Sequence, residues 1–86
     1  SNFMVQPYIF MLNSLPTLIP NAKEVESIIK FDVFTLTNDG IIKKTDMQFS
    51  NGMKRKDIPY FDIQGQIVWG ATAMMLSELK TILNRF

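Results

Sequence analysis

The sequence predicts an α+β domain in which an antiparallel or mixed sheet of four to five strands carries one C-terminal helix. Over most of the chain, apolar residues alternate or run in short stretches, as they do in strands, and the helical period begins only after residue 70. Turn sequences separate these stretches at Asn38-Asp39-Gly40, Ser50-Asn51-Gly52 and Gln64-Gly65. Strands followed by a single terminal helix are typical of the α+β class.

The first predicted strand covers residues 3–12, where apolar side chains occupy both faces of the alternation. Phe3 and Val5 fall on one face, and Tyr8 falls on the other. A strand that is apolar on both faces is typical of a covered position inside a sheet. Pro7 has no N–H to donate, so it fits best at a bulge or at the sheet margin.

A second strand is predicted over residues 25–31, which follow a proline-containing loop and are rich in β-branched side chains. Asp32 is then in a position to cap a short helical turn that runs through Phe34 and Leu36. The turn signal Asn38-Asp39-Gly40 ends that segment.

A β-hairpin is predicted where residues 41–49 and 53–63 flank Ser50-Asn51-Gly52. The Asn-Gly pair can supply the positive φ angles of a type I′ turn. A second reversal at Gln64-Gly65 brings residues 66–69 back as another strand.

The C-terminal helix is predicted over residues 71–86, because apolar positions recur there at helical spacing. The stripe consists of Thr72, Met75, Leu76, Leu79, Ile82, Leu83 and Phe86. One helix covers only one face of a sheet of this size, so the other face needs a further cover. We expect that cover to be a missing segment of the same polypeptide or a second copy of the chain.

Composition excludes several classes of chemistry. The chain has no cysteine and no histidine, so disulfides, the usual zinc sites, Ser-His-Asp triads and Cys-His dyads are impossible within it. Nine Lys and Arg against eight Asp and Glu lack the basic excess of nucleic-acid binders. No apolar run approaches the roughly 18 residues of a membrane span, and no signal-peptide pattern opens the chain. We therefore expect a cytoplasmic protein that binds neither nucleic acid nor membrane.

Two glycines around the only tryptophan suggest a phosphate-binding loop, which the following residues exclude. Gly65 and Gly70 have P-loop spacing, but Ala71-Thr72 stands where such a loop needs Lys and then Ser or Thr. The glycines are instead assigned to a turn and to a strand-to-helix junction. Trp69 has two interpretations, stacking on a base or core packing, and core packing is favoured for an aromatic residue at a strand end.

Two charged clusters also have two interpretations each. Lys54-Arg55-Lys56, with Lys43 and Lys44 across the hairpin, would contact a nucleotide or cofactor phosphate, or would form a solvated hairpin tip that resists aggregation. The solvated tip is favoured. Glu24 and Glu26 would share a divalent cation, or would be an exposed pair, which is the commoner arrangement.

Three segments resemble coenzyme A diphosphatase-like Nudix hydrolases. Residues 60–73, YFDIQGQIVWGATA, resemble the C-terminal signature of that group, in which an apolar-Trp-Gly-x-Thr-Ala junction leads into the last helix. Residues 1–8 look like the strand that follows the Nudix box. Residues 20–25 look like the Pro-Asn-x-x-Glu-Val segment after that strand. The three matches occur in the family's order and span most of the chain.

The resemblance implies that residues 1–86 are a single domain, the C-terminal portion of a Nudix α/β/α sandwich. The family hydrolyses coenzyme A or other nucleoside-diphosphate-linked substrates with Mg²⁺ or Mn²⁺, which the glutamates of the Nudix box hold. The box, with its run Arg-Glu-U-x-Glu-Glu-x-Gly-U where U is a bulky apolar residue, is absent. Glu24, Glu26 and Glu78 are the only glutamates. The chain by itself is therefore expected to be inactive and to hold no metal.

Candidate site residues follow from the same resemblance. Val5, Pro7, Tyr8 and Trp69 would help to wall the substrate cleft of the parent protein, and Glu24 would be an auxiliary metal ligand or base outside the box. No metal ligand is assigned within this chain. The expected partner is the N-terminal half of the parent or a second copy in a homodimer. The alternative is a noncatalytic binding or dimerisation module derived from the same fold.

Overall fold

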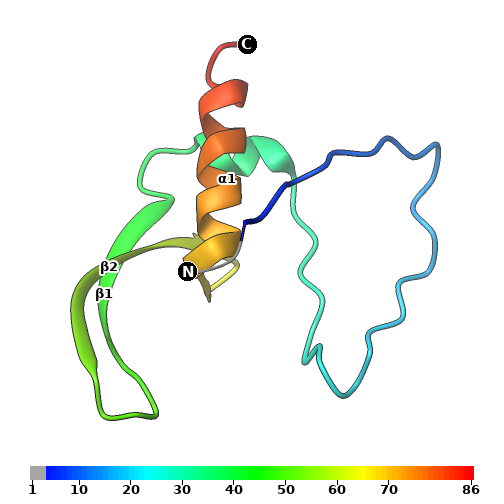
Figure 1. The fold of residues 1–86 in the computed structure, drawn as a ribbon. Coiled ribbons are helices and arrows are strands. Elements are labelled where there is room, and N and C mark those ends of the chain that lie inside the picture. The colour runs from blue at the N-terminus through cyan, green and yellow to red at the C-terminus, as the bar shows by residue number, and fades with distance from the viewer. Residues whose placement is uncertain (1–3) are drawn as a thin grey trace. The chain divides into compact units, whose positions relative to one another are not determined.

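The computed structural model describes residues 4–86. The chain divides into two units, Ser1–Phe31 and Asp32–Phe86, and each is described by itself. All helices and strands of the described residues belong to the second unit (Figure 1). They are the 3₁₀ helix η1 (Val33–Thr37), the strands β1 (Ile42–Gln48), β2 (Lys54–Ile63) and β3 (Gln66–Val68), and the helix α1 (Gly70–Leu83).

The short helix η1 begins where the sequence places its cap. The backbone N–H of Phe34 donates to Oδ1 of Asp32 at 2.9 Å, which satisfies one of the free donors at the helix start. Leu36, in the same helix, is fully buried. The ammonium of Lys80 in α1 donates to the carbonyl oxygen of Leu36 at 2.7 Å and links the two helices. The predicted helical turn after Asp32 is confirmed.

The sheet is antiparallel, with the strand order β1-β2-β3. β1 pairs with β2 with Ile42 opposite Phe61, and β2 pairs with β3 with Phe61 opposite Val68. The predicted hairpin, the returning strand and the C-terminal helix are therefore all confirmed. Together they make an α+β unit with an antiparallel sheet and one C-terminal α-helix.

The type I′ turn lies at the second reversal and not at the first. At the first, the N–H of Phe49 donates to the carbonyl of Met53, and a positive φ occurs at Gly52 but not at Asn51. This is a three-residue loop closed by a left-handed glycine, so the expected type I′ turn is wrong there. Two consecutive positive φ angles, 53° at Gln64 and 77° at Gly65, occur between β2 and β3, as a type I′ turn requires.

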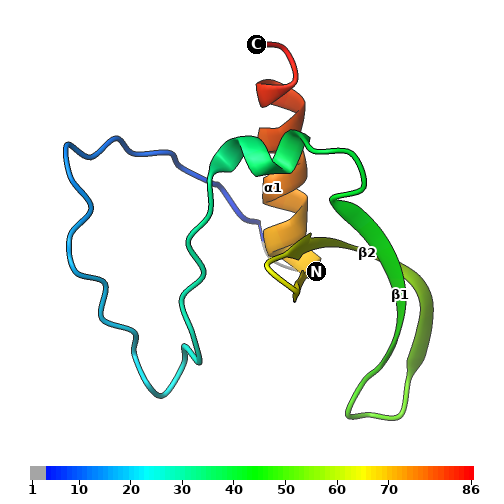
Figure 2. The same ribbon diagram turned by 180° about the vertical axis from the view of Figure 1, so that it is seen from behind.

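A β-bulge interrupts the hairpin midway. The pairing between β1 and β2 shifts between Thr45 and Met47, so that one residue of β1, Asp46, lies opposite two residues of β2. Asp57, one of those two, has a φ of 57°, and its N–H donates to Oδ1 of Asp46 at 3.1 Å. Bulges increase the local twist of a strand pair. Figures 1 and 2 show the resulting curvature of β1 and β2 from opposite sides.

The strands predicted at 3–12 and 25–31 are not formed. Phe3 lies outside the described residues, and residues 4–31 contain neither helix nor strand. A turn at Asn21, whose carbonyl accepts from the N–H of Val25 at 2.7 Å, is a local feature of this unit. A strand needs a neighbour to pair its N–H and C=O groups, and apolar alternation by itself supplies none. The sheet thus has three strands in the described residues, fewer than the four to five expected.

The core of the second unit is small. Its buried apolar side chains are Leu36, Ile41, Phe61 and Ile63. No residue of α1 is fully buried. Of the predicted stripe, four members are half-buried, and Thr72, Ile82 and Phe86 are exposed. No helix within residues 4–86 is long and apolar enough to cross a membrane.

Candidate functional site

A groove of about 530 Å³ lies between β2 and the first half of α1, within the second unit. Residues 55–61 form its β2 side, with Ile42 of β1 beside them. The α1 side is formed by Trp69, Gly70, Ala73, Met74 and Ser77. A concave groove with aromatic, apolar and charged lining residues is a candidate ligand site.

The tip of the hairpin lies close to the start of α1. The ring of Phe49, near the hairpin tip, lies 5.7 Å from the ring of Trp69, with 47° between their planes. The bulge at Asp46 and Asp57 lies between this contact and the other end of the hairpin, and bulges increase the twist of a strand pair. Gly70 starts α1 with a φ of 68°, which glycine adopts without strain and which confirms its assignment to the strand-to-helix junction.

Trp69 is a wall residue of the groove and not a core residue. Its side chain remains 43% exposed, so the favoured core interpretation is wrong. It is the N-cap residue of α1, and no side chain accepts a hydrogen bond there from the first turn. Tyr60 lines the same groove and is half-buried. Phe61 opposite Val68 places Tyr60 beside the residue that follows β3, which is Trp69.

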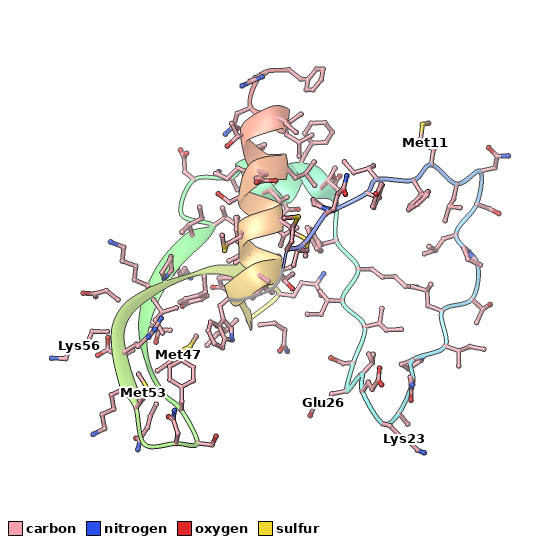
Figure 3. All side chains as sticks on the ribbon, viewed as in Figure 1. Met11, Lys23, Glu26, Met47, Met53 and Lys56 are labelled. Atoms are coloured by element: carbon pink, nitrogen blue, oxygen red, sulfur yellow. The ribbon has the colours of Figure 1, made fainter. Side chains whose placement is uncertain are left out.

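The three cations of Lys54-Arg55-Lys56 do not share one environment. Arg55 pairs across the hairpin with Met47, so the two side chains share a face of the sheet. Figure 3 shows Met47 on the side of the hairpin that faces α1, whereas Lys56 points away from α1. Within residues 4–86, the guanidinium of Arg55 has no hydrogen-bond or ion-pair partner. Arg55 is therefore an unneutralised cation on the groove side of β2.

Lys43 is engaged elsewhere on the hairpin. Its ammonium binds Oδ2 of Asp62 at 2.6 Å across β1 and β2. The hydrogen bond from Lys43 holds the pKa of the Asp62 carboxyl below its ordinary value of 3.8. The same bond and the charge of Asp62 raise the pKa of Lys43 above 10.5. Lys43 thus stabilises strand pairing and is not available to a ligand in the groove.

The remaining candidates of the sequence lie in the first unit. Val5, Pro7 and Tyr8 are all exposed, and Tyr8 has a tilted ring contact with Phe10, the ring centroids 6.5 Å apart. They are predicted cleft residues that belong to a different unit from Trp69.

Glu24 belongs to the turn at Asn21, to whose carbonyl its N–H donates at 3.0 Å. The neighbouring Glu26 projects from the tip of that segment (Figure 3). Residues 4–86 contain no group of three or more acidic, histidine or cysteine side chains that could hold a metal ion. Glu24 and Glu26 are exposed residues of a loop.

The groove combines residues that sequence reasoning treated separately. Arg55 belonged to a charged cluster and Trp69 to a strand end, and Tyr60 was not singled out as a site residue. The strand register set by the turn at Gln64-Gly65 would have predicted that Tyr60 lies beside Trp69. The bulge that curves the hairpin has no comparable sequence signal. No protein-family model, no curated protein and no solved structure matches this chain.

Proposed function

We propose that this chain is the C-terminal portion of a Nudix pyrophosphohydrolase that acts on coenzyme A or another nucleoside-diphosphate-linked substrate. The proposal rests first on residues 60–73, whose sequence resembles the C-terminal signature of that group. The order of β2, the turn, β3 and α1 is compatible with it, since Trp69 stands directly between β3 and α1. In the parent protein, Val5, Pro7, Tyr8 and Trp69 wall the substrate cleft.

The structural observation that supports a missing cover in this proposal is the exposed apolar run in residues 4–12. Met4, Ile9, Phe10 and Met11 are each at least 77% exposed. A soluble domain rarely leaves so many large apolar side chains together in water, so such a run marks an interaction surface. In the proposed parent, residues 4–12 and 25–31 are the further strands of the sheet, and the upstream half covers them.

Catalysis belongs to the upstream half in this proposal. The Nudix box supplies the glutamates that hold Mg²⁺ or Mn²⁺, and the metal polarises the diphosphate and activates water. Glu24, Glu26 and Glu78 are too few to form such a site. Glu24 is retained as the candidate for an auxiliary ligand or base, and the 86-residue chain is inactive by itself.

The test is coenzyme A hydrolysis with Mg²⁺ by the 86-residue chain and by a protein extended with the coding sequence immediately upstream. The extended protein is expected to hydrolyse coenzyme A, and the short chain is expected to be inactive. The matched control is the extended protein with one glutamate of its Nudix box changed to glutamine, which should lose activity while keeping its fold. Turnover by the short chain, or an upstream sequence without a Nudix box, would contradict the proposal.

A second candidate is a noncatalytic dimerisation module, which the same exposed run favours. Tyr8 to Leu12 is an unbroken apolar stretch of aromatic and aliphatic side chains, and each is at least 66% exposed. Size-exclusion chromatography with light scattering distinguishes the candidates when Phe10→Asp is compared with Lys23→Asp, a charge change in the same unit. A dimer that only Phe10→Asp dissociates supports the module. A monomeric wild-type chain rules it out.

A further inference from the structure

We propose that the groove between β2 and α1 holds the nucleoside diphosphate part of the substrate, with the base against Trp69 and the phosphates at Arg55. The inference deepens the proposed function and rests on it for the choice of a nucleoside diphosphate. In this inference, the present chain binds the nucleoside diphosphate, and the upstream half of the parent protein supplies the metal chemistry.

The size of the groove suits a small organic ligand. Its volume of about 530 Å³ lies inside the range of about 300–1,000 Å³ that is usual for small-molecule sites. Apolar groups such as Ile58 and Met74 line it together with a few polar and charged ones. That mixture fits a ligand with a flat, weakly polar ring and a charged end.

Trp69 supplies the surface for the ring. Its contact with Phe49 holds the indole in a tilted arrangement, yet 43% of the side chain stays accessible. Tyr60 lies beside it in the groove wall. Aromatic side chains bind nucleobases by stacking, whatever the base, because every base has a π face. The geometry therefore favours a base and not a purely aliphatic ligand.

Arg55 supplies the charge for the phosphates. Its planar guanidinium can donate two parallel hydrogen bonds to phosphate oxygens, and no carboxylate of residues 4–86 neutralises it. Lys56 and Asp57 line the same wall, and the Lys56 side chain points away from α1 (Figure 3). Anion binding in this groove therefore depends on Arg55 more than on Lys54, which is not among the lining residues.

The experiment is a fluorescence titration of the 86-residue chain with ADP. Trp69 is the only tryptophan, so its emission reports on this groove. A saturable change is expected with ADP, and no change is expected with pyrophosphate, which lacks a base. Arg55→Gln should weaken ADP binding about tenfold, whereas Lys54→Gln, the same charge change on the adjacent residue, should alter it less than about twofold.

Three results would overturn the inference. The first is the absence of a saturable change in emission with ADP. The second is an equal loss of ADP binding in Arg55→Gln and Lys54→Gln. The third is an emission that changes with chain concentration in the absence of ADP, which would mean that a second copy fills the groove. Failure here is separable from failure of the proposed function. Coenzyme A hydrolysis by the extended protein without ADP binding by the chain removes only the inference. ADP binding by the chain with an inactive extended protein removes only the hydrolase.

Discussion

Ile63→Ala should destabilise the Asp32–Phe86 unit severely. Ile63 is 2% exposed and belongs to a core of four buried apolar side chains, so little neighbouring structure can collapse into the space it leaves. Truncating a buried isoleucine to alanine costs about 2–5 kcal/mol, which includes the lost transfer free energy and the cavity. A unit of this length has a total stability of about 3–8 kcal/mol. The substitution thus removes a large fraction of the free energy of unfolding.

Urea unfolding followed by Trp69 emission measures the effect, with Ile67→Ala as the matched control. Ile67 is the same residue type in the neighbouring strand β3, but it is 52% exposed. Its truncation should cost about 1 kcal/mol or less. Equal losses in the two variants would refute the assignment of the core to Ile63. A wild-type chain that lacks a cooperative transition would refute the independent stability of the unit.

Three further predictions concern the hairpin and the boundary between the units. The folded pKa of Asp62 lies below 3.8 and that of Lys43 above 10.5, so their ion pair contributes constantly between these values. The contribution is lost as the pH falls through the lowered pKa of Asp62 or rises through the raised pKa of Lys43. NMR titration of the Asp62 carboxyl should show the lowered pKa, and Lys43→Met should return it toward 3.8. In urea unfolding, Asp57→Gly should raise the free energy of unfolding by about 0.5–1 kcal/mol, and Asp57→Val should lower it by about 1–2 kcal/mol, since a β-branched residue tolerates positive φ poorly. The opposite order would show that the bulge is not strained. Trypsin should cut after Lys23 and Lys30 before it cuts within β1 or β2, because residues 4–31 have no ladder hydrogen bonds. Mass spectrometry identifies the first products, and early cleavage at Lys54 or Lys56 would contradict this prediction.

The parts of the fold that the sequence predicts are those specified by local chemistry. Asp32 caps η1 through its own side chain, and the glycines at 52 and 65 supply left-handed φ at both reversals. The helical period after residue 70 is likewise a local pattern. None of these features depends on residues distant in the sequence. For that reason the hairpin, β3 and α1 could all be predicted with little error in their bounds.

The parts that could not be predicted depend on pairing between distant residues. The bulge at Asp46 and Asp57 follows from strand register, which a single sequence does not specify at that point. Residues far apart in the sequence likewise form the contact of Phe49 with Trp69 and the groove that contains Arg55 and Trp69. The type I′ turn was predicted at Asn51-Gly52 and occurs at Gln64-Gly65, because Asn-Gly permits a type I′ turn but does not impose one.

Residues 4–12 and 25–31 do not form strands because each would need a neighbouring strand to pair its backbone hydrogen bonds. This absence bears most directly on function. The apolar alternation of these residues describes a strand covered on both faces, yet a strand forms only when a neighbour accepts its hydrogen bonds. β1 offers a poor neighbour, because Lys43, Lys44 and Asp46 place charges along it, and such charges discourage pairing at a sheet edge. β3, with three residues, is too short to pair with either segment along its length. Neither β1 nor β3 therefore supplies a suitable neighbour for residues 4–12. In the proposed parent protein, an upstream half would supply that neighbour within one continuous chain, which is why we propose it ahead of self-association.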